Sequence, residues 1–177
     1  MKTKKAIITE GSLIYNYLPM DYSDAFECTY VSTKEIKADD VQIAFWSAKP
    51  TWINWLFKLR NLLVKPFKLD ANEDKQVNNL KETIITGKAH GNVSIPAKSE
   101  NETILRMDDK HLTFYVSVQV KERIVNSKSV IVSTLVHYNN KLGKYYFSAI
   151  CPFHRLIVRN MLMYVIKNNY QSNSRRA

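Results

Sequence analysis

Gly143-Lys-Tyr-Tyr-Phe-Ser-Ala-Ile-Cys-Pro-Phe-His-Arg-Leu-Ile-Val158 is the stretch of sequence that decides the predicted fold. Its aromatic first half predicts a strand over residues 145–150. Pro152 has a fixed φ and no N–H group, so it suits the first turn of a helix. The apolar spacing that follows predicts a helix over residues 153–169. The stretch therefore predicts a strand that leads into a long C-terminal helix with a basic first turn.

Strand-like segments precede this stretch. The clearest is residues 111–120, where apolar side chains from Leu112 to Val120 alternate with polar or aromatic ones. This alternation identifies one face of a strand, although it does not show which face of the sheet a cavity would adjoin. Asn139-Asn-Lys-Leu-Gly143 predicts a hairpin connection with a flexible glycine. Similar but shorter patterns predict strands at residues 83–86, 92–95, 102–107 and 129–138.

The N-terminal half supplies the remaining elements. Residues 26–31 predict the first strand, residues 33–64 predict two short helices separated at Pro50, and residues 70–79 predict a polar link. The predicted fold class is α+β, with a curved antiparallel sheet of six to seven strands wrapped on a long C-terminal helix. In its order of elements the chain resembles the helix-grip architecture of START-like and Bet v 1-like proteins. That resemblance implies a cavity between the sheet and the C-terminal helix.

Composition fits one domain with an uneven charge distribution. The chain has 177 residues, of which 45% are hydrophobic, and this is enough to bury a core. Residues 1–20 are predicted to form an N-terminal arm, 21–170 a single helix-grip-like domain, and 171–177 a disordered tail. The formal charge is +10, and no acidic residue follows Glu122. A positive face is expected, which suits an anionic ligand or a lipid surface and equally suits a solvated surface.

The sequence carries few signals of compartment. Two cysteines, Cys28 and Cys151, cannot form a framework of several disulfides and lie in apolar contexts, so a reducing cytoplasm is expected. The basic N-terminus is followed by no apolar signal region, and no uninterrupted apolar run reaches the ~18 residues of a spanning helix. The protein is therefore predicted to be soluble, or at most peripheral to a membrane.

A series of motifs resembles a known family. They are Asp21-Tyr-Ser-Asp-Ala-Phe, Pro50-Thr-Trp, Leu59-Arg-Asn-Leu-Leu-Val-Lys-Pro, Asp109-Lys-His-Leu-Thr-Phe-Tyr-Val-Ser-Val, Asn139-Asn-Lys-Leu-Gly-Lys-Tyr-Tyr-Phe and Pro152-Phe-His-Arg-Leu-Ile-Val. In this order they resemble the bacterial family catalogued as domain of unknown function 2867, from about Asp21 to Met163. That family usually has arginine after the hairpin glycine, where this chain has Lys144. Some relatives carry the domain behind a reductase-like domain, but this chain has no dinucleotide-binding glycine motif, so the resemblance implies no cofactor and no established activity.

His154 and Arg155 are the first candidate site residues. In the first turn of the predicted helix they lie beside free backbone N–H groups, where an anion is favoured. An inward-facing arginine must be paired, because an unpaired buried charge costs several kcal/mol. Candidate partners are three carboxylates: Asp21, Asp24 and Asp109. The pair then forms either an anion clamp at the cavity mouth or an internal ion pair between helix and sheet.

Asp109 and His111 are weaker candidates for catalysis. Two residues apart at the start of a strand, they point to the same face, and a carboxylate can orient an imidazole for acid–base work. The alternative is an aspartate that caps a turn beside a surface histidine. His154 is a third candidate base, with a hydrogen-bonded core histidine as its alternative.

Aromatic and polar side chains supply the remaining ligand candidates. Tyr115, Ser117 and Tyr145 belong to predicted strands and could line a concave face, or else lie on the convex side. Trp52, with Trp55 and the nearby lysines, could form an interfacial patch, or pack as core. The four histidines and two cysteines show no metal-ligand spacing, and no nucleic-acid-binding module is present.

Three functions follow from these observations. The favoured one is a non-catalytic module that binds a hydrophobic or amphipathic small molecule between the sheet and the C-terminal helix, with Arg155 and His154 fixing a negative group. The second is a START-like enzyme with Asp/His acid–base chemistry. The third is a peripheral partner of an oxidoreductase or an anionic membrane. The sequence indicates neither the ligand nor the oligomeric state.

Overall fold

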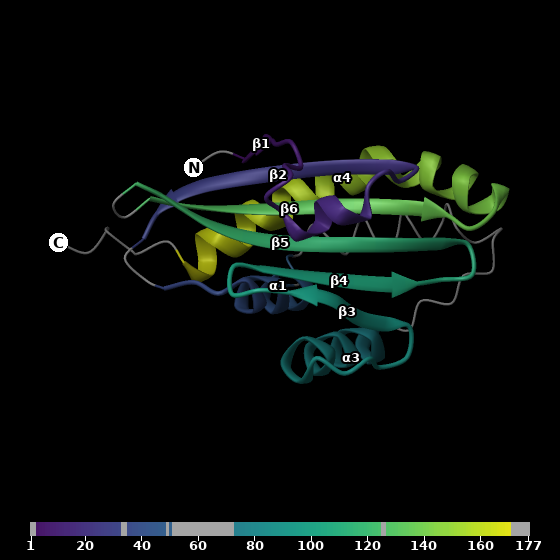
Figure 1. Cartoon of the computed structure of the whole chain (residues 1–177), viewed down its shortest axis with the longest axis horizontal. Coiled ribbons are helices and arrows are strands. Elements are labelled where there is room, and N and C mark those ends of the chain that lie inside the picture. Colours follow the sequence, from purple (N-terminus) through teal and green to yellow (C-terminus); the bar gives the residue numbers. More distant parts are fainter. Residues whose placement is uncertain (1–2, 33–34, 49, 51–72, 125–126, 171–177) are drawn as a thin grey trace.

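The computed structural model describes residues 3–32, 35–48, 50, 73–124 and 127–170. Its strands form one six-stranded antiparallel sheet in the order β1-β2-β6-β5-β4-β3 (Figure 1). The strands are β1 (Thr3–Lys5), β2 (Tyr22–Val31), β3 (Val93–Lys98), β4 (Glu102–Asp108), β5 (Leu112–Ile124) and β6 (Ser127–Tyr138). The helices are α1 (Ala38–Ser47), α3 (Glu73–Thr86), α4 (Lys141–Asn169) and a short 3₁₀ helix, η1 (Leu13–Tyr17). The predicted α+β class, with a curved antiparallel sheet and a long C-terminal helix, is confirmed.

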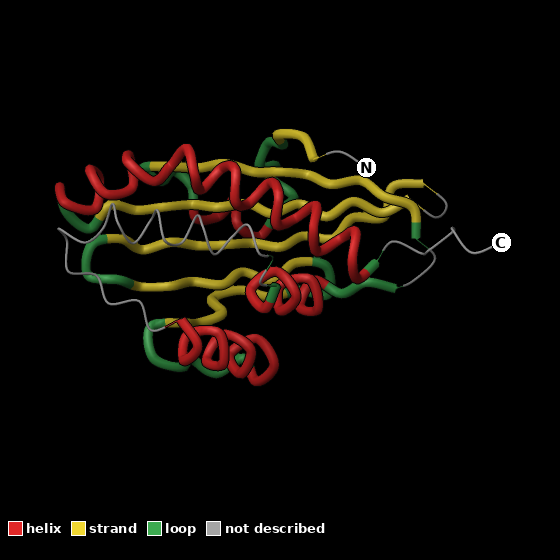
Figure 2. Tube along the Cα trace, turned by 180° about the vertical axis from the view of Figure 1, so that it is seen from behind, coloured by secondary structure: helices red, strands yellow, loops and turns green. Residues whose placement is uncertain are grey.

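The α-helices of the described residues, α1, α3 and α4, all cover one face of the sheet (Figure 2). The largest core cluster joins α4 to the apolar rows of β2, β5 and β6, with Val158, Leu162 and Val165 against Val118 and Val132. The alternation predicted from Leu112 to Val120 therefore faces the helices. α3 covers the β3–β4 edge through Leu80 and Ile84 and completes this layer.

The opposite, outer face of the sheet is also buried. The N-terminal segment crosses it, and η1 places Ile14 against Ile104, Tyr115 and Leu135 (Figure 1). Residues 1–20, expected as an arm, thus supply both an edge strand and a cover for the sheet. Because both faces are covered, polar side chains that alternate with the apolar row are buried as well.

The predicted strand at residues 83–86 and most of the predicted polar link at 70–79 are wrong, because both belong to α3. Leu80, Thr83 and Ile84 have helical spacing and are buried together. A run of only four β-branched residues does not distinguish a strand from one turn of a helix. Of the two helices expected over 33–64, α1 lies in the first part, and the part after Pro50 lies outside the described residues.

The predicted hairpin at 139–143 and strand at 145–150 are wrong as well, because α4 begins at Lys141. Asn140 is the N-cap, and its Oδ1 accepts a hydrogen bond from the backbone N–H of Gly143 at 3.0 Å. Gly143 lies so close to the turn between β4 and β5 that a Cβ there would be 2.0 Å from the carbonyl oxygen of His111. The glycine therefore permits close packing rather than a flexible turn.

Pro152 lies inside α4 rather than at its start. A proline in a helix removes one backbone hydrogen bond, and the carbonyl left without a donor belongs to Ser148, four residues earlier. Pro152 and Ser148 are both on the exposed side of α4, where solvent can take the place of the missing donor. Among the described helices, α4 is the one long and apolar enough, by length and composition alone, to span a membrane.

Replacing Gly143 with alanine tests the close approach of α4 to the sheet. G143A should lower the free energy of unfolding by about 1–3 kcal/mol, because backbone has to move to admit the methyl group. Chemical denaturation measures this change. G11A is the matched control, since a Cβ at Gly11 meets nothing within 4 Å. Equal effects of the two substitutions would contradict the packing role of Gly143.

Glu27 gives the fold a pH dependence. Burial alone would raise the pKa of this carboxyl, but hydrogen bonds from Lys4, Ser129 and Arg123 outweigh burial and lower it below its ordinary value of 4.5. A lowered folded-state pKa stabilises the protein fully above about pH 4.5, and the stabilisation disappears as the pH falls through the folded-state value. E27Q should therefore be less stable than the wild type at neutral pH, with a difference that shrinks in acid. Thermal unfolding across pH would refute this if the difference stayed constant.

Candidate functional site

One carboxylate interrupts the apolar row of β2 that faces α4. Phe26, Cys28 and Tyr30 belong to the core beneath the helix, whereas Asp24, in the same row, is only 6% exposed. Its register partner on β6 is Thr134, which is 2% exposed. Two polar side chains from neighbouring strands therefore lie in a layer that is otherwise apolar.

Tyr22 connects Asp24 to the edge of α4. Its phenol donates a hydrogen bond to Asp24 Oδ2 at 2.5 Å and accepts one from Arg155 Nε at 3.0 Å. The Arg155 guanidinium also lies over the Tyr22 ring, 5.5 Å from its centroid. Burial, followed by the hydrogen bond to Asp24, raises the pKa of the Tyr22 phenol above its ordinary value. The phenol therefore keeps its proton and acts as a fixed donor to the carboxylate.

His154 enters the same place from α4. Its Nε2 is 3.7 Å from Asp24 Oδ2, a distance compatible with charge attraction but too long for a hydrogen bond. The imidazole packs against Phe147, at 5.8 Å between ring centroids, and edge-on against Tyr22 at 6.0 Å. We call these five side chains the Asp24 cluster: Tyr22, Asp24, Thr134, His154 and Arg155.

Three atoms of the Asp24 cluster retain unused hydrogen-bonding capacity. Asp24 Oδ1, Thr134 Oγ1 and His154 Nε2 are buried, and none has a hydrogen-bond partner among the described residues. They come from β2, β6 and α4, and β2 is more than a hundred residues from the other two elements in the sequence. Buried polar atoms in proteins are nearly always hydrogen-bonded, so these three atoms make the Asp24 cluster the candidate site.

Glu102, a buried carboxylate on the outer face of the sheet, differs from Asp24 in that its hydrogen-bonding capacity is fully used. Glu102 is 2% exposed and has no cationic partner among the described residues, yet both of its oxygens are bonded. Its five donors are Ser12 Oγ at 2.7 Å, Ser117 Oγ at 2.6 Å, Gln119 Nε2 at 3.1 Å and the backbone N–H groups of Leu13 at 2.8 Å and Ile14 at 3.3 Å. Those N–H groups open η1, where an anion is favoured. Glu102 therefore fastens the N-terminal segment to the sheet.

The residues predicted from sequence separate into different places. His154 and Arg155 belong to the Asp24 cluster, although in mid-helix rather than in a first turn. Ser117 and Tyr115 lie on the outer face, where Ser117 bonds Glu102 and Tyr115 packs against Tyr17 and Arg106. Tyr145 is on α4 and 69% exposed. Trp52 lies outside the described residues.

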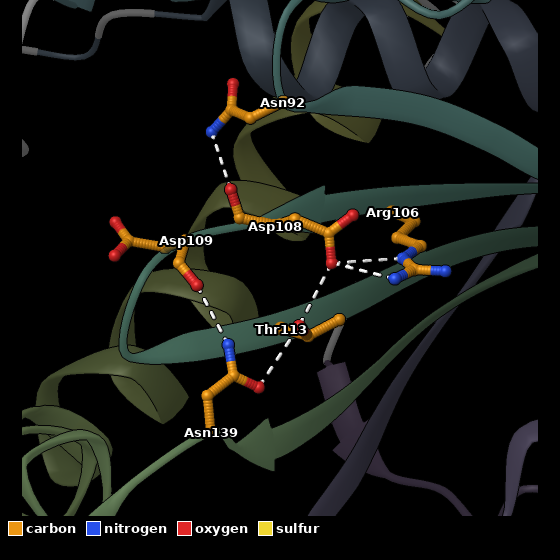
Figure 3. A network of polar contacts seen from close by, with 6 residues as sticks. All are labelled: Asn92, Arg106, Asp108, Asp109, Thr113 and Asn139. Carbon is orange, nitrogen blue, oxygen red and sulfur yellow. Dashed lines mark hydrogen bonds and ion pairs between the residues drawn. The ribbon is translucent and has the colours of Figure 1, made fainter.

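Asp109 and His111 form a turn. Asp109 Oδ1 accepts a hydrogen bond from the backbone N–H of His111 at 3.2 Å. Beside it, Asp108 Oδ1 accepts hydrogen bonds from Thr113 and twice from Arg106, and Asn139 Nδ2 donates to the Asp109 carbonyl (Figure 3). Asn92 reaches the Asp108 carbonyl from the segment before β3. The network joins the ends of four strands, and these contacts match the turn-capping alternative.

The described cavity lies away from the Asp24 cluster. It is an open pocket of about 790 Å³ beside the β3–β4 turn, with Leu13, Glu102 and Lys128 in its wall. Its position differs from the space expected between the sheet and the C-terminal helix. Among the described residues, no three His, Cys, Asp or Glu side chains gather as metal ligands.

Asp24 was named from sequence only as a partner for Arg155, and Tyr22 and Thr134 were missed as site residues. One signal was available. In Tyr22-x-Asp24-x-Phe26-x-Cys28, a carboxylate occupies a row that is otherwise aromatic or apolar. An inward carboxylate in a strand needs a reason, and pairing or function is the usual one.

Asp24 and Glu102 should respond differently to amide substitution. E102Q should lower the free energy of unfolding by about 3 kcal/mol or more, because the amide N–H₂ faces donors that bonded a charged oxygen. D24N should change it by about 1 kcal/mol or less, because Asn can still accept the Tyr22 bond and has no buried charge. Urea unfolding of both variants measures the contrast. Equal losses would show that both carboxylates serve only the fold.

Comparison with known proteins gives one match. Residues 17–161 match the family described as "Protein of unknown function (DUF2867)". No curated protein and no solved structure matches the chain. The match includes β2, β6 and the part of α4 up to Met161, so it covers all five members of the Asp24 cluster. This chain belongs to the DUF2867 family.

Proposed function

We propose that this protein binds a small molecule between β2, β6 and the middle of α4, with the Asp24 cluster holding its polar end. The observation that carries the proposal is the convergence of three buried polar atoms from three elements, none of which has a hydrogen-bond partner in the part of the chain that the structure describes. Tyr22 and Phe147, 4.8 Å apart between centroids, add an aromatic wall beside them. An apolar surface with a few convergent polar groups is typical of small-molecule sites.

The chemistry of the Asp24 cluster suggests the ligand class. Asp24 Oδ1 accepts hydrogen bonds, so the buried end of the ligand should be a donor, such as a hydroxyl or a protonated amine. Thr134 and His154 can each donate or accept beside it. Arg155 is exposed at the edge, and among the described residues its terminal nitrogens bond no carboxylate, so it suits an acidic group. The ligand is an amphipathic molecule with a donor at one end and an acid at the other.

Acid–base catalysis is a second candidate for the same place. The supporting observation is that a carboxylate, an imidazole and a protonated phenol meet within one cluster, with 3.7 Å between Asp24 Oδ2 and His154 Nε2. A ligand atom seated between these groups could exchange a proton with them. For this second candidate we propose Asp24 and His154, rather than Asp109 and His111, as the acid–base pair.

Binding at the Asp24 cluster predicts a ligand that copurifies with the protein. Native mass spectrometry of wild-type protein purified from its own host should show an added mass that D24N and T134V both lack. D109N is the matched control, because Asp109 is exposed and serves a turn, so it should retain the mass. An adduct retained by D24N would contradict the site. Failure of the wild type to carry an adduct, or to be thermally stabilised by any hydroxy acid or amino acid in a panel, would contradict the function.

The catalytic candidate makes a separate prediction. Incubation of the wild type with the copurified molecule in D₂O should raise the mass of that molecule, because a proton taken from carbon is replaced by deuterium, and H154N should abolish this exchange while it still binds. Mass spectrometry of the released small molecule distinguishes the two candidates. An unchanged mass with wild-type protein would leave binding alone.

A further inference from the structure

The outer side of α4 is the one large apolar helix face that the described fold leaves uncovered. Leu142, Tyr145, Leu156 and Tyr164 are 37%, 69%, 48% and 39% exposed, respectively. Only 28% of the most apolar 18-residue window of α4 is buried. A soluble helix usually exposes a polar face opposite its core face, so this composition requires a separate explanation.

The exposed apolar residues of α4 form a continuous stripe. At 3.6 residues per turn, Leu142, Tyr145, Ala149, Pro152 and Leu156 follow one another at three- or four-residue intervals along one side. The core residues Val158, Met161 and Val165 point to the opposite side. The sheet lies against one side of α4 (Figure 2), and the exposed stripe is on the other side.

Charges of a single sign flank the stripe. α4 contains five basic residues and no acidic one, and all five are exposed: Lys141, Lys144, Arg155, Arg159 and Lys167. Within residues 3–32, 35–48, 73–124 and 127–170, no carboxylate forms an ion pair with any of them. Arg155 and Arg159 each use one nitrogen in a hydrogen bond, to the hydroxyl groups of Tyr22 and Thr3.

We propose that the outer face of α4 docks on an anionic lipid surface, with the helix parallel to the plane of the membrane. The lysines and arginines would contact lipid phosphate and carboxylate groups, and Tyr145 and Leu156 would enter the boundary between head groups and acyl chains. Charge complementarity favours this occupant, because an apolar stripe flanked by cations matches an anionic bilayer surface. A spanning orientation does not fit, since it would remove the inner face of α4 from the sheet.

Vesicle co-sedimentation of the full-length protein tests this inference. The protein should sediment with phosphatidylcholine vesicles that contain phosphatidylserine and remain in solution with phosphatidylcholine alone, at about 0.1 M salt. Binding should weaken steeply toward about 1 M salt, where the Debye length falls from about 10 Å to about 3 Å. The double variant K144Q/K167Q should lower the partition coefficient by about fivefold per charge, or roughly 25-fold in total.

Matched variants distinguish a specific contribution of the α4 stripe to vesicle binding from the general effect of removing an exposed apolar residue or a charge. Y145S/L156S should lower partitioning about tenfold or more, while I85S/K88Q, which removes an exposed apolar residue and a lysine from the α3 side, should leave it unchanged. All these side chains are exposed, so circular dichroism and thermal unfolding should match the wild type. No binding to anionic vesicles at about 0.1 M salt, or equal losses in the α4 and α3 variants, would overturn the inference. Loss of self-association in Y145S/L156S, without vesicle binding in the wild type, would assign the face to a second copy instead.

Discussion

The packing of α4 across β2, β5 and β6 is the contact on which the rest of the structure depends. Val158, Leu162 and Val165 lose nearly all their exposed surface against the sheet, and each such side chain contributes about 1.5–3 kcal/mol. The same contact brings His154 from the helix to Asp24 on β2, 130 residues apart in the chain. The site therefore exists only because the helix lies where hydrophobic burial holds it. The polar side chains of the Asp24 cluster are held in position by this apolar packing and not by their contacts with one another.

Two carboxylates, one on each face of the sheet, show how hydrogen-bonding capacity separates a structural role from a functional one. Glu102 is surrounded by five donors and has no capacity to spare, so it stabilises the contact between sheet and N-terminal segment. Asp24 is also buried, but its Oδ1 has no hydrogen-bond partner among the described residues. The same is true of two neighbouring atoms, Thr134 Oγ1 and His154 Nε2. A desolvated group that is incompletely bonded destabilises the fold, and proteins retain such groups mainly at functional sites.

Prediction from sequence succeeded where local patterns matched burial and was wrong where they were ambiguous. The alternation from Leu112 to Val120 predicted β5, since one face of that strand is apolar throughout. The strands predicted at residues 83–86 and 145–150 were wrong, because a short apolar run fits a helix and a strand equally well. Pro152 predicted a helix start, but an exposed position inside α4 tolerates it. The sequence indicated His154 and Arg155 as candidate site residues because of their residue types, and it indicated Asp24 only as a candidate partner for Arg155.

The sequence by itself determined the α+β class, the strand periodicity and the basic, acid-free C-terminal region, because these follow from local spacing and composition. Only the tertiary structure decided which face of the sheet each row occupies. It placed Ser117 and Tyr115 beneath the N-terminal segment and Asp24 beneath α4. The physical reason is that side chains of a strand alternate with a period of two. This alternation separates the two faces of a strand, but it does not indicate which face a distant helix covers. That choice depends on contacts between segments more than a hundred residues apart.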